Sequence, residues 1–236
     1  MIVLNEVGRS FEMTEEDFQR ALENGLKFTR LSTVPYKKVT EEVSVYTALA
    51  GKYIFKRDDI QCFGFDRIFK RSVMEAKRYK ILPHIFVPSE ITIWIDANIF
   101  LKTDKKFLVE SLLGDNDMVL FKHPYRKTVY EEFETLKKEE RFKIPWLQEK
   151  LALQEERYRS EGFEGGKLYE CNFIIRRNNE RVNALMNAWW AEITAWQWRD
   201  QVSLPYVIWK YGSDVKIGEI QGNIRNNKMF KYVCVN

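Results

Sequence analysis

The stretch ITIWIDANIFL, residues 91–101, decides the fold. An apolar, β-branched run ends in the polar residues Asp96-Ala97-Asn98, which predicts a buried strand with a break in its middle. Side chains two positions apart on extended backbone point the same way, so we expect Asp96 and Asn98 to share one face at the strand's carboxyl end. Open α/β sheets bind ligands at that end. The alternative is a simple turn that ends the strand, because Asp and Asn both favour turns.

Strands and helices alternate on both sides of this stretch. Further strands are expected at residues 43–51, 60–65, 117–123 and 168–177, and helices at 69–80, 128–160, 179–198 and 199–212. This alternation predicts an α/β sandwich with a mostly parallel central sheet. Residues 1–40 are expected to form a helical appendage, with a helix from Thr14 to Gly25, and residues 41–236 to form the main domain.

Composition narrows the function classes. The chain has 236 residues, of which 45% are hydrophobic and 31% charged, with a formal net charge of +4. That apolar content excludes a disordered chain. Charges of both signs are mixed along the sequence, which disfavours a dedicated nucleic-acid binder and fits an anionic small ligand.

Cysteine usage and apolar runs bear on location. The three cysteines, Cys62, Cys171 and Cys234, are far apart and lack C-x-x-C spacing, which argues against a disulfide framework and a structural zinc site. No apolar run reaches the roughly 18 residues that a membrane span needs. The acidic stretch after the first four apolar residues does not match a secretory signal. We therefore expect a cytoplasmic protein, with membrane association through partners as the alternative; the oligomeric state is left open.

Two groups of residues predict phosphate chemistry. Asp96 and Asn98 offer hard oxygen ligands that suit Mn²⁺ or Mg²⁺ bound mainly through a substrate's phosphates. Lys77, Arg78 and Lys80 lie on the helix that precedes this strand and are candidates for phosphate contact. The alternative for these three is an ordinary solvated basic face.

Seven blocks of sequence occur in an order that resembles a known family. They are Tyr46–Ala48, Tyr79–His84, Ile93–Ile99, His123–Arg126, Tyr169–Arg176, Trp189–Ile193 and Arg199–Tyr206. A basic helix before a hydrophobic strand with an Asp-x-Asp-like motif is similar to nucleotide-sugar glycosyltransferases of the GT-A fold. More narrowly, the set resembles the glycosyltransferase family of plant Golgi mucilage-related proteins and their bacterial and viral relatives. The likeness covers roughly residues 43–211, with Asp-x-Asn in place of Asp-x-Asp.

The resemblance implies a fold and a reaction. The fold would be a GT-A-like (Rossmann-like) three-layer α/β/α sandwich. The reaction would be metal-dependent transfer of a sugar from a nucleotide-diphosphate sugar, a UDP-sugar in the first place, to a hydroxyl of a glycan or glycoconjugate, as in polysaccharide biosynthesis. Asp96 and Asn98 would hold the metal. The expected donor-binding residues are Tyr46, Thr47, Ala48, Lys77, Arg78, Lys80, Asp96, Ala97, Asn98, Asn172 and Gln201; for Tyr46 and Thr47 the alternative is plain strand packing.

Two carboxylates are candidates for the general base that an inverting transfer needs. Asp200 is the first candidate, although its position at a helix start also suits an N-cap. Glu170 is the second, or else it accepts hydrogen bonds from donor-sugar hydroxyls. His123 and Arg126 are expected to contact phosphate or acceptor. A retaining transfer would need no such base, and the residues do not decide between the two.

Other function classes stay open. A metal-dependent hydrolase of the ceramidase type, an activity assigned to some plant members of the family, would need clustered histidine ligands, whereas His84 and His123 are far apart. A non-catalytic nucleotide-binding or glycan-binding module is the third class. Trp190 and Trp198 lie off the apolar stripe of their helix, so they either stack on an acceptor sugar or pack against the helices of residues 128–160.

Overall fold

A computed structural model describes residues 2–6, 9–13, 41–50, 57, 59–64 and 68–233. The helix expected from Thr14 to Gly25 lies outside these residues. Cys234 also lies outside them. The first two segments, β1 (Ile2–Glu6) and β2 (Arg9–Met13), form an antiparallel pair that the sequence pattern did not predict.

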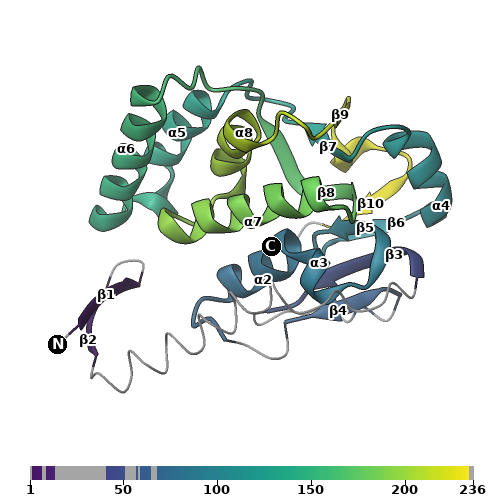
Figure 1. Cartoon of the computed structure of the whole chain (residues 1–236), viewed down its shortest axis with the longest axis horizontal. Coiled ribbons are helices and arrows are strands. Elements are labelled where there is room, and N and C mark those ends of the chain that lie inside the picture. The colour runs from purple at the N-terminus through teal and green to yellow at the C-terminus, as the bar shows by residue number, and fades with distance from the viewer. Residues whose placement is uncertain are drawn as a thin grey trace.

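A six-stranded sheet lies at the centre of the domain (Figure 1). Its order is β4 (Gln61–Phe63), β3 (Glu41–Ala48), β5 (Ser89–Ile95), β8 (Tyr169–Arg177), β7 (Met118–Lys122) and β9 (Ile217–Ile220). Strand β8 runs antiparallel to both of its neighbours, and the other adjacent pairs are parallel. The expected mostly parallel α/β sheet is therefore confirmed.

Unequal layers cover the two faces of this sheet (Figure 1). Along β5, Trp94 packs into one apolar cluster, whereas Ile93 and Ile95 pack into another, as alternation along a strand requires. The Trp94 face carries the helices α2 (Ser72–Ile81), α5 (Val129–Lys138), α6 (Pro145–Ser160), α7 (Glu180–Ala195) and α8 (Asp200–Tyr211). The opposite face carries α4 (Lys105–Leu108), the π-helical turn η1 (Val109–Leu113) and a ribbon of β6 (Ile99–Leu101) with β10 (Phe230–Tyr232).

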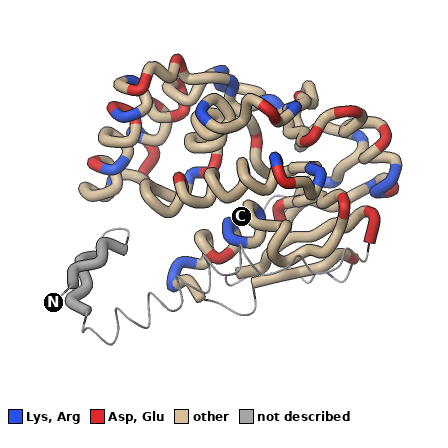
Figure 2. Tube along the Cα trace, in the orientation of Figure 1, with Lys and Arg blue, Asp and Glu red and all other residues tan. Residues whose placement is uncertain are grey.

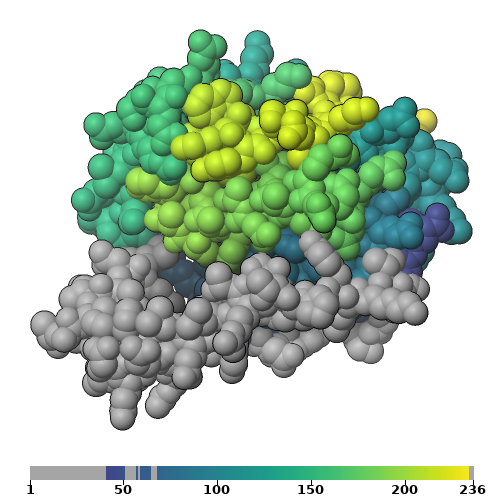
Figure 3. Space-filling view, viewed as in Figure 1, coloured from purple at the N-terminus to yellow at the C-terminus, as the bar shows by residue number. Residues whose placement is uncertain are grey.

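Local sequence explains how the longer helices begin. The Thr128 hydroxyl caps α5 by accepting a hydrogen bond from the Glu131 N–H at 3.3 Å. Val129, Phe133 and Leu136 then recur at helical spacing and are fully buried. Figure 2 shows both charge signs interspersed along α5 and α6. In the space-filling view, α7 and α8 form part of the surface turned toward the viewer (Figure 3).

Several short elements differ from the expectations. Pro83 begins the helix α3 (Pro83–Phe86), because proline suits the first turn of a helix. The expected strand over residues 91–101 is two strands, β5 and β6, which belong to different sheets. The sequence pattern did not predict α4, η1, β9, β10 or the 3₁₀ turn η3 (Ile224–Asn226), which are all too short to show a clear period. Within the described part of the chain, no helix combines the length and apolar character needed to cross a membrane.

A β-bulge in β8 positions the residues of the site. Leu120 of β7 pairs with Ile174, and the next residue, Phe121, pairs with Glu170, so Cys171–Phe173 have no counterpart on β7. Cys171 and Ile174 both pack toward the helix-covered face although they are three positions apart. Bulges re-aim side chains at the ends of strands. This one places Glu170 and its neighbours beside the end of β5.

Candidate functional site

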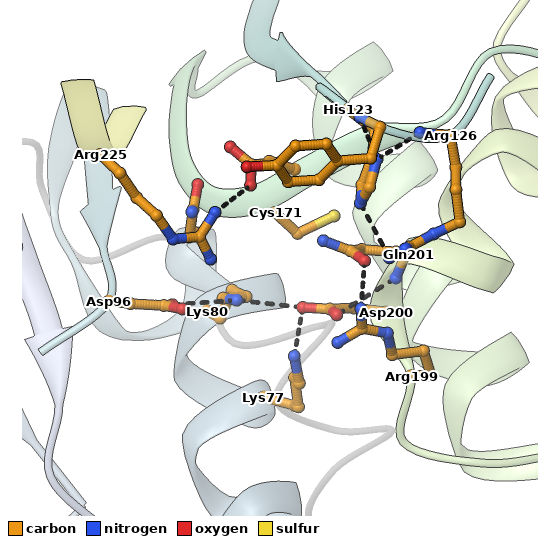
Figure 4. A pocket seen from close by; sticks show the side chains of 13 residues that line it. Lys77, Lys80, Asp96, His123, Arg126, Cys171, Arg199, Asp200, Gln201 and Arg225 are labelled. Atoms are coloured by element: carbon orange, nitrogen blue, oxygen red, sulfur yellow. Dashed lines mark hydrogen bonds and ion pairs between the residues drawn. The ribbon is translucent and has the colours of Figure 1, made fainter. Parts of the chain in front are cut away.

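Two adjoining cavities open where β5 and β7 end and α8 begins. The larger, about 430 Å³, is called the polar pocket (Figure 4). It is lined by Lys77, Lys80, Asp96, His123, Tyr125, Arg126, Glu170, Cys171, Asn172, Arg199, Asp200, Gln201 and Arg225. The smaller, about 370 Å³, is called the side pocket; it is lined by Ala48, Ser72, Val73, Ala76, Lys77, Lys80, Trp94, Asp96, Ala97 and Asn98. The two pockets meet at the side chains they share: Lys77, Lys80 and Asp96.

An ion-pair chain occupies this junction (Figure 4). Asp200 is buried and accepts hydrogen bonds from Lys77 and from Lys80, the latter at 3.0 Å. The Lys80 ammonium also lies 3.1 Å from Oδ1 of Asp96, so it bridges the two carboxylates. Burial alone would raise the pKa of Asp200, but the charges of both lysines outweigh it and hold that pKa well below its usual range. The same two carboxylates raise the pKa of Lys80 against its own burial.

Helix α2 delivers two of the three predicted basic residues. Lys77 and Lys80 are three positions apart and therefore lie on one face of the helix. Arg78 lies on another face, where it pairs with Glu75 at 3.0 Å and stacks on the Tyr79 ring. Arg78 lines neither pocket, so the structure does not support the expected phosphate contact for this residue.

The Asp96–Asn98 segment is a turn. The Ile99 N–H donates to the Asp96 carbonyl at 2.9 Å, so the expectation of extended backbone was wrong and the turn alternative holds. Asp96 and Asn98 nevertheless line the same pocket. Trp94 donates to Oδ1 of Asp96 at 2.9 Å, and the Asn98 amide donates to the Val233 carbonyl at 3.2 Å.

Hydrogen bonds hold this turn from both sides. The Asp96 N–H donates to the Asn172 carbonyl at 2.8 Å. The buried Arg57 guanidinium donates to the carbonyls of Ala97 and Ile99, each at 2.8 Å. The turn is therefore anchored to β8 and to the Arg57 guanidinium.

The residues expected at the end of β3 separate into two groups. Ala48 lines the side pocket. Tyr46 and Thr47 are fully buried and line neither pocket. The Tyr46 ring packs edge-on against Trp94 with centroids 5.3 Å apart, so for these two residues the structure favours strand packing over nucleoside contact.

Glu170 and Asn172 line the polar pocket with free acceptors. Oε1 of Glu170 accepts a hydrogen bond from Arg225 at 3.1 Å. Among the residues that the structure describes, the buried atoms Glu170 Oε2 and Asn172 Oδ1 have no partner in hydrogen-bond geometry. Burial raises the pKa of Glu170, and the nearby Arg225 charge only partly offsets this.

Arginines and a histidine form the wall of the polar pocket near α5. Arg126 and Arg199 both pair with Glu132, a fully buried carboxylate on α5; for Arg199 the distance is 2.8 Å. His123 accepts a hydrogen bond at Nδ1 from the Arg126 N–H at 3.0 Å. Burial, helped by the Arg126 charge, lowers the pKa of His123 to about 4, so this imidazole is neutral at neutral pH. Gln201 lies beside Arg199 on the same wall (Figure 4).

Sequence reasoning missed four residues that line the polar pocket, namely Tyr125, Cys171, Arg199 and Arg225. Tyr125 and Arg199 lie inside the recognised blocks H-P-Y-R and R-D-Q, so membership of these blocks could have predicted that they line the site. Arg225 comes from η3 and has no local signal, because only tertiary folding brings it to Glu170. Trp198 stacks on Phe142 with centroids 5.4 Å apart, and Trp190 meets Phe69 edge-on, which supports packing rather than sugar stacking.

The residues at the turn fit a loosely held divalent ion. Asp96 is 40% exposed at its side chain, so an ion can reach it, and Asn98 adds an amide oxygen on the same pocket. Mg²⁺ is typically held by one or two carboxylates, with phosphates and water completing its shell. The described residues contain no cluster of three or more His, Cys, Asp or Glu side chains. This donor set therefore suits an ion that arrives with a phosphate ligand rather than a structural zinc.

Comparisons with known proteins place the chain in a family. Residues 65–234 match the family model described as the TOD1/MUCI70 glycosyltransferase-like domain. No curated protein matches. Among solved structures, the apo structure of WbbM, a bifunctional glycosyltransferase, is similar over 68% of this chain and 28% of its own length, at 14% identity and a TM-score of 0.38. The chain thus spans less than a third of that protein. Since the family model covers most of the chain, the protein belongs to the TOD1/MUCI70 family of glycosyltransferase-like domains.

Proposed function

We propose that the protein is a glycosyltransferase that takes its sugar from a nucleotide-diphosphate donor and uses Mg²⁺ or Mn²⁺ at Asp96 and Asn98. The observation that carries the proposal is the junction of the two pockets. There, the buried Lys80 ammonium, the partly buried Lys77 ammonium and one accessible carboxylate meet within one hydrogen-bonded chain. A diphosphate with its cation matches this arrangement, because the lysines offset phosphate charge and the carboxylate offsets the cation.

The leaving group explains why such charges are useful. When the bond from the sugar to the diphosphate breaks, the diphosphate gains negative charge. A bound divalent ion would supply Lewis-acid stabilisation of that charge. Lys77 and Lys80 would donate hydrogen bonds to the phosphate oxygens from fixed positions on α2, without reorganisation during the reaction.

Glu170 is the better candidate for general base. Asp200 was the first candidate from sequence, but its low pKa and its two lysine partners make it a weak proton acceptor. Glu170 has a raised pKa and a buried oxygen without a partner that lines the polar pocket. A base with a pKa nearer the working pH is more effective. In this proposal Asp200 is the ion-pair partner of Lys77 and Lys80 and not the base.

The nucleoside would lie in the side pocket. Ala48, Val73, Ala76 and Trp94 give this pocket small and apolar walls next to the lysine pair. Small-molecule sites commonly combine such walls with a few placed polar groups. The donor sugar would then extend from the shared lysines into the polar pocket.

A thermal-shift screen tests the donor site. UDP, GDP, CMP and dTDP would each be added with Mn²⁺, Mg²⁺ or EDTA. Ligand at about 100 times its dissociation constant adds roughly 2.7 kcal/mol of stability, which is a shift of a few degrees for a protein of this size. We expect one nucleotide to raise the melting temperature with metal, and Asp96→Ala to lose the effect.

Asp115→Ala is the matched control, because Asp115 is an exposed carboxylate that lines neither pocket. It should respond like wild type. If no nucleotide shifts the melting temperature of wild type under any condition, the donor proposal is wrong. A shift that Asp96→Ala retains would place the metal elsewhere.

A further inference from the structure

An exposed tyrosine stands at the mouth of the polar pocket. Tyr125 follows β7 and is 72% exposed, although it lines the pocket. Its ring meets His123 edge-on with centroids 6.1 Å apart. Its hydroxyl accepts a hydrogen bond from the Asn223 amide at 3.3 Å. The ring is therefore held on two sides while much of its surface faces solvent.

The Asn223 contact links Tyr125 to the base candidate. Oδ1 of Asn223 accepts a hydrogen bond from the Arg225 N–H at 2.9 Å, which caps η3. Arg225 in turn donates to Glu170 at 3.1 Å. Two loops that are far apart in sequence are thus joined across the pocket mouth, and they fix the tyrosine relative to the carboxylate.

Two unsatisfied acceptors lie in the same pocket. Glu170 Oε2 and Asn172 Oδ1 are buried without a partner among the described residues. A buried acceptor without a donor is costly, so a bound donor group would be stabilised there. Hydroxyl groups are such donors. An aromatic ring beside oxygens that can accept hydrogen bonds from hydroxyl groups matches a pyranose. A pyranose has C–H groups on its faces and O–H groups around its edge.

Charge on this wall favours a neutral sugar. Arg225 is paired with Glu170, and Arg126 and Arg199 are both paired with Glu132. An acidic sugar would have to compete with these carboxylates for the arginines, which a neutral sugar does not.

We propose that Tyr125, Glu170 and Asn172 form the acceptor subsite and that it takes a neutral pyranose stacked on the Tyr125 ring. Calling this sugar the acceptor rests on the proposed function. In the transfer, the acceptor oxygen forms a bond to the anomeric carbon of the donor sugar and its proton passes to Glu170. The bond from that carbon to the diphosphate breaks, and its electron pair leaves with the diphosphate.

The test is direct binding of simple glycosides. Saturation-transfer NMR would be recorded with the methyl pyranosides of glucose, galactose, mannose and xylose, and with methyl glucuronide, each with and without UDP and Mn²⁺. We expect at least one neutral glycoside to bind wild type, about tenfold or more weaker binding to Tyr125→Ala, and near-wild-type binding to Tyr125→Phe, which keeps the ring. Tyr211→Ala is the matched control, since Tyr211 is a 56% exposed tyrosine that lines neither pocket. UDP affinity should be the same in all four proteins.

Each other outcome has a definite meaning. The subsite proposal is overturned if no neutral glycoside binds wild type at tens of millimolar, if Tyr125→Ala binds like Tyr211→Ala, or if methyl glucuronide alone binds. If glycosides bind through Tyr125 but no nucleotide binds, the subsite stands and the donor proposal fails. Melting curves of the variants show whether each is folded, and the exposure of Tyr125 makes a folding defect in Tyr125→Ala unexpected.

Discussion

The Arg176 guanidinium donates a hydrogen bond to the main-chain carbonyl of Lys80, the residue whose side chain bridges Asp96 and Asp200. Arg176 is fully buried, and its other contacts include the Tyr46 hydroxyl. Its positive charge lies at the carboxyl end of α2, where the helix dipole favours a cation. Arg176 therefore holds the last turn of α2, and with it the lysine that faces the pockets.

Replacing Arg176 should lower the free energy of unfolding and loosen the last turn of α2, which carries Lys80. Arg176→Met leaves the Lys80 carbonyl and the Tyr46 hydroxyl without this donor, and loss of such a buried network typically costs about 2–4 kcal/mol. Urea unfolding measures the change. Tyr46→Phe, which removes one hydroxyl, should cost about 1 kcal/mol. Arg141→Met is the exposed control and should stay within about 0.5 kcal/mol of wild type. Equal stability of Arg176→Met and Arg141→Met would contradict the anchoring role.

Glu170→Gln should abolish the acid limb of the pH–rate profile. As a base, Glu170 must be deprotonated, so wild-type activity should fall as pH decreases through its raised pKa, which lies above the ordinary value of 4.5. The variant should turn over about 10²-fold to 10⁴-fold more slowly, with little pH dependence in that range. Nucleotide affinity should not change. Glu164→Gln, at an exposed glutamate outside both pockets, is the control. A variant that keeps the wild-type rate would exclude Glu170 as the base.

Asp200→Asn should strengthen diphosphate binding. In wild type the Asp200 carboxylate competes with an incoming phosphate for Lys77 and Lys80. Removing its charge frees the lysines, and we expect about tenfold tighter binding of inorganic pyrophosphate, the equivalent of one pKa unit of charge interaction. Calorimetry measures this affinity. Asp214→Asn makes the same change in net charge at an exposed site outside the pockets. Weaker pyrophosphate binding to Asp200→Asn than to Asp214→Asn would mean that Asp200 positions the lysines for phosphate rather than competing for them.

Both histidines should make the fold less stable in mild acid. Burial lowers the pKa of His84 and of His123 to about 4, below the ordinary value of 6.5. Between these values the unfolded chain binds more protons than the folded one, so stability decreases as pH falls from about 6.5 toward 4. Denaturant unfolding at several pH values measures the slope. His84→Asn and His123→Asn should each reduce it, and an unchanged slope in both variants would assign it to other groups.

Sequence pattern predicted the alternation of strands and helices around Asp96 and most of the residues that line the polar pocket, because polar and charged residues cluster at strand ends and helix starts. Helical geometry explains the failure at Arg78, since a residue next to Lys77 points to a different face than Lys77 and Lys80 do. For Tyr46 the sequence left nucleoside contact and strand packing open, and packing is favoured because β3 is covered on both faces and the side chain enters the core. The bulge in β8 and the position of Arg225 beside Glu170 depend on contacts between segments far apart in sequence. Local hydrophobic periodicity therefore does not predict them.

The turn that carries Asp96 and Asn98 is closed by a distant part of the chain. Asn98 exchanges hydrogen bonds with Val233, 135 positions later, at 3.2 Å and 2.9 Å. During synthesis these two hydrogen bonds cannot form until residue 233 has left the ribosome. A fragment of residues 43–211 would contain every recognised sequence block and would still lack Arg225 and the two hydrogen bonds between Asn98 and Val233. The site is thus completed only when the last part of the domain has been made. A shortened chain would keep the recognised sequence blocks but would lack residues that complete the site.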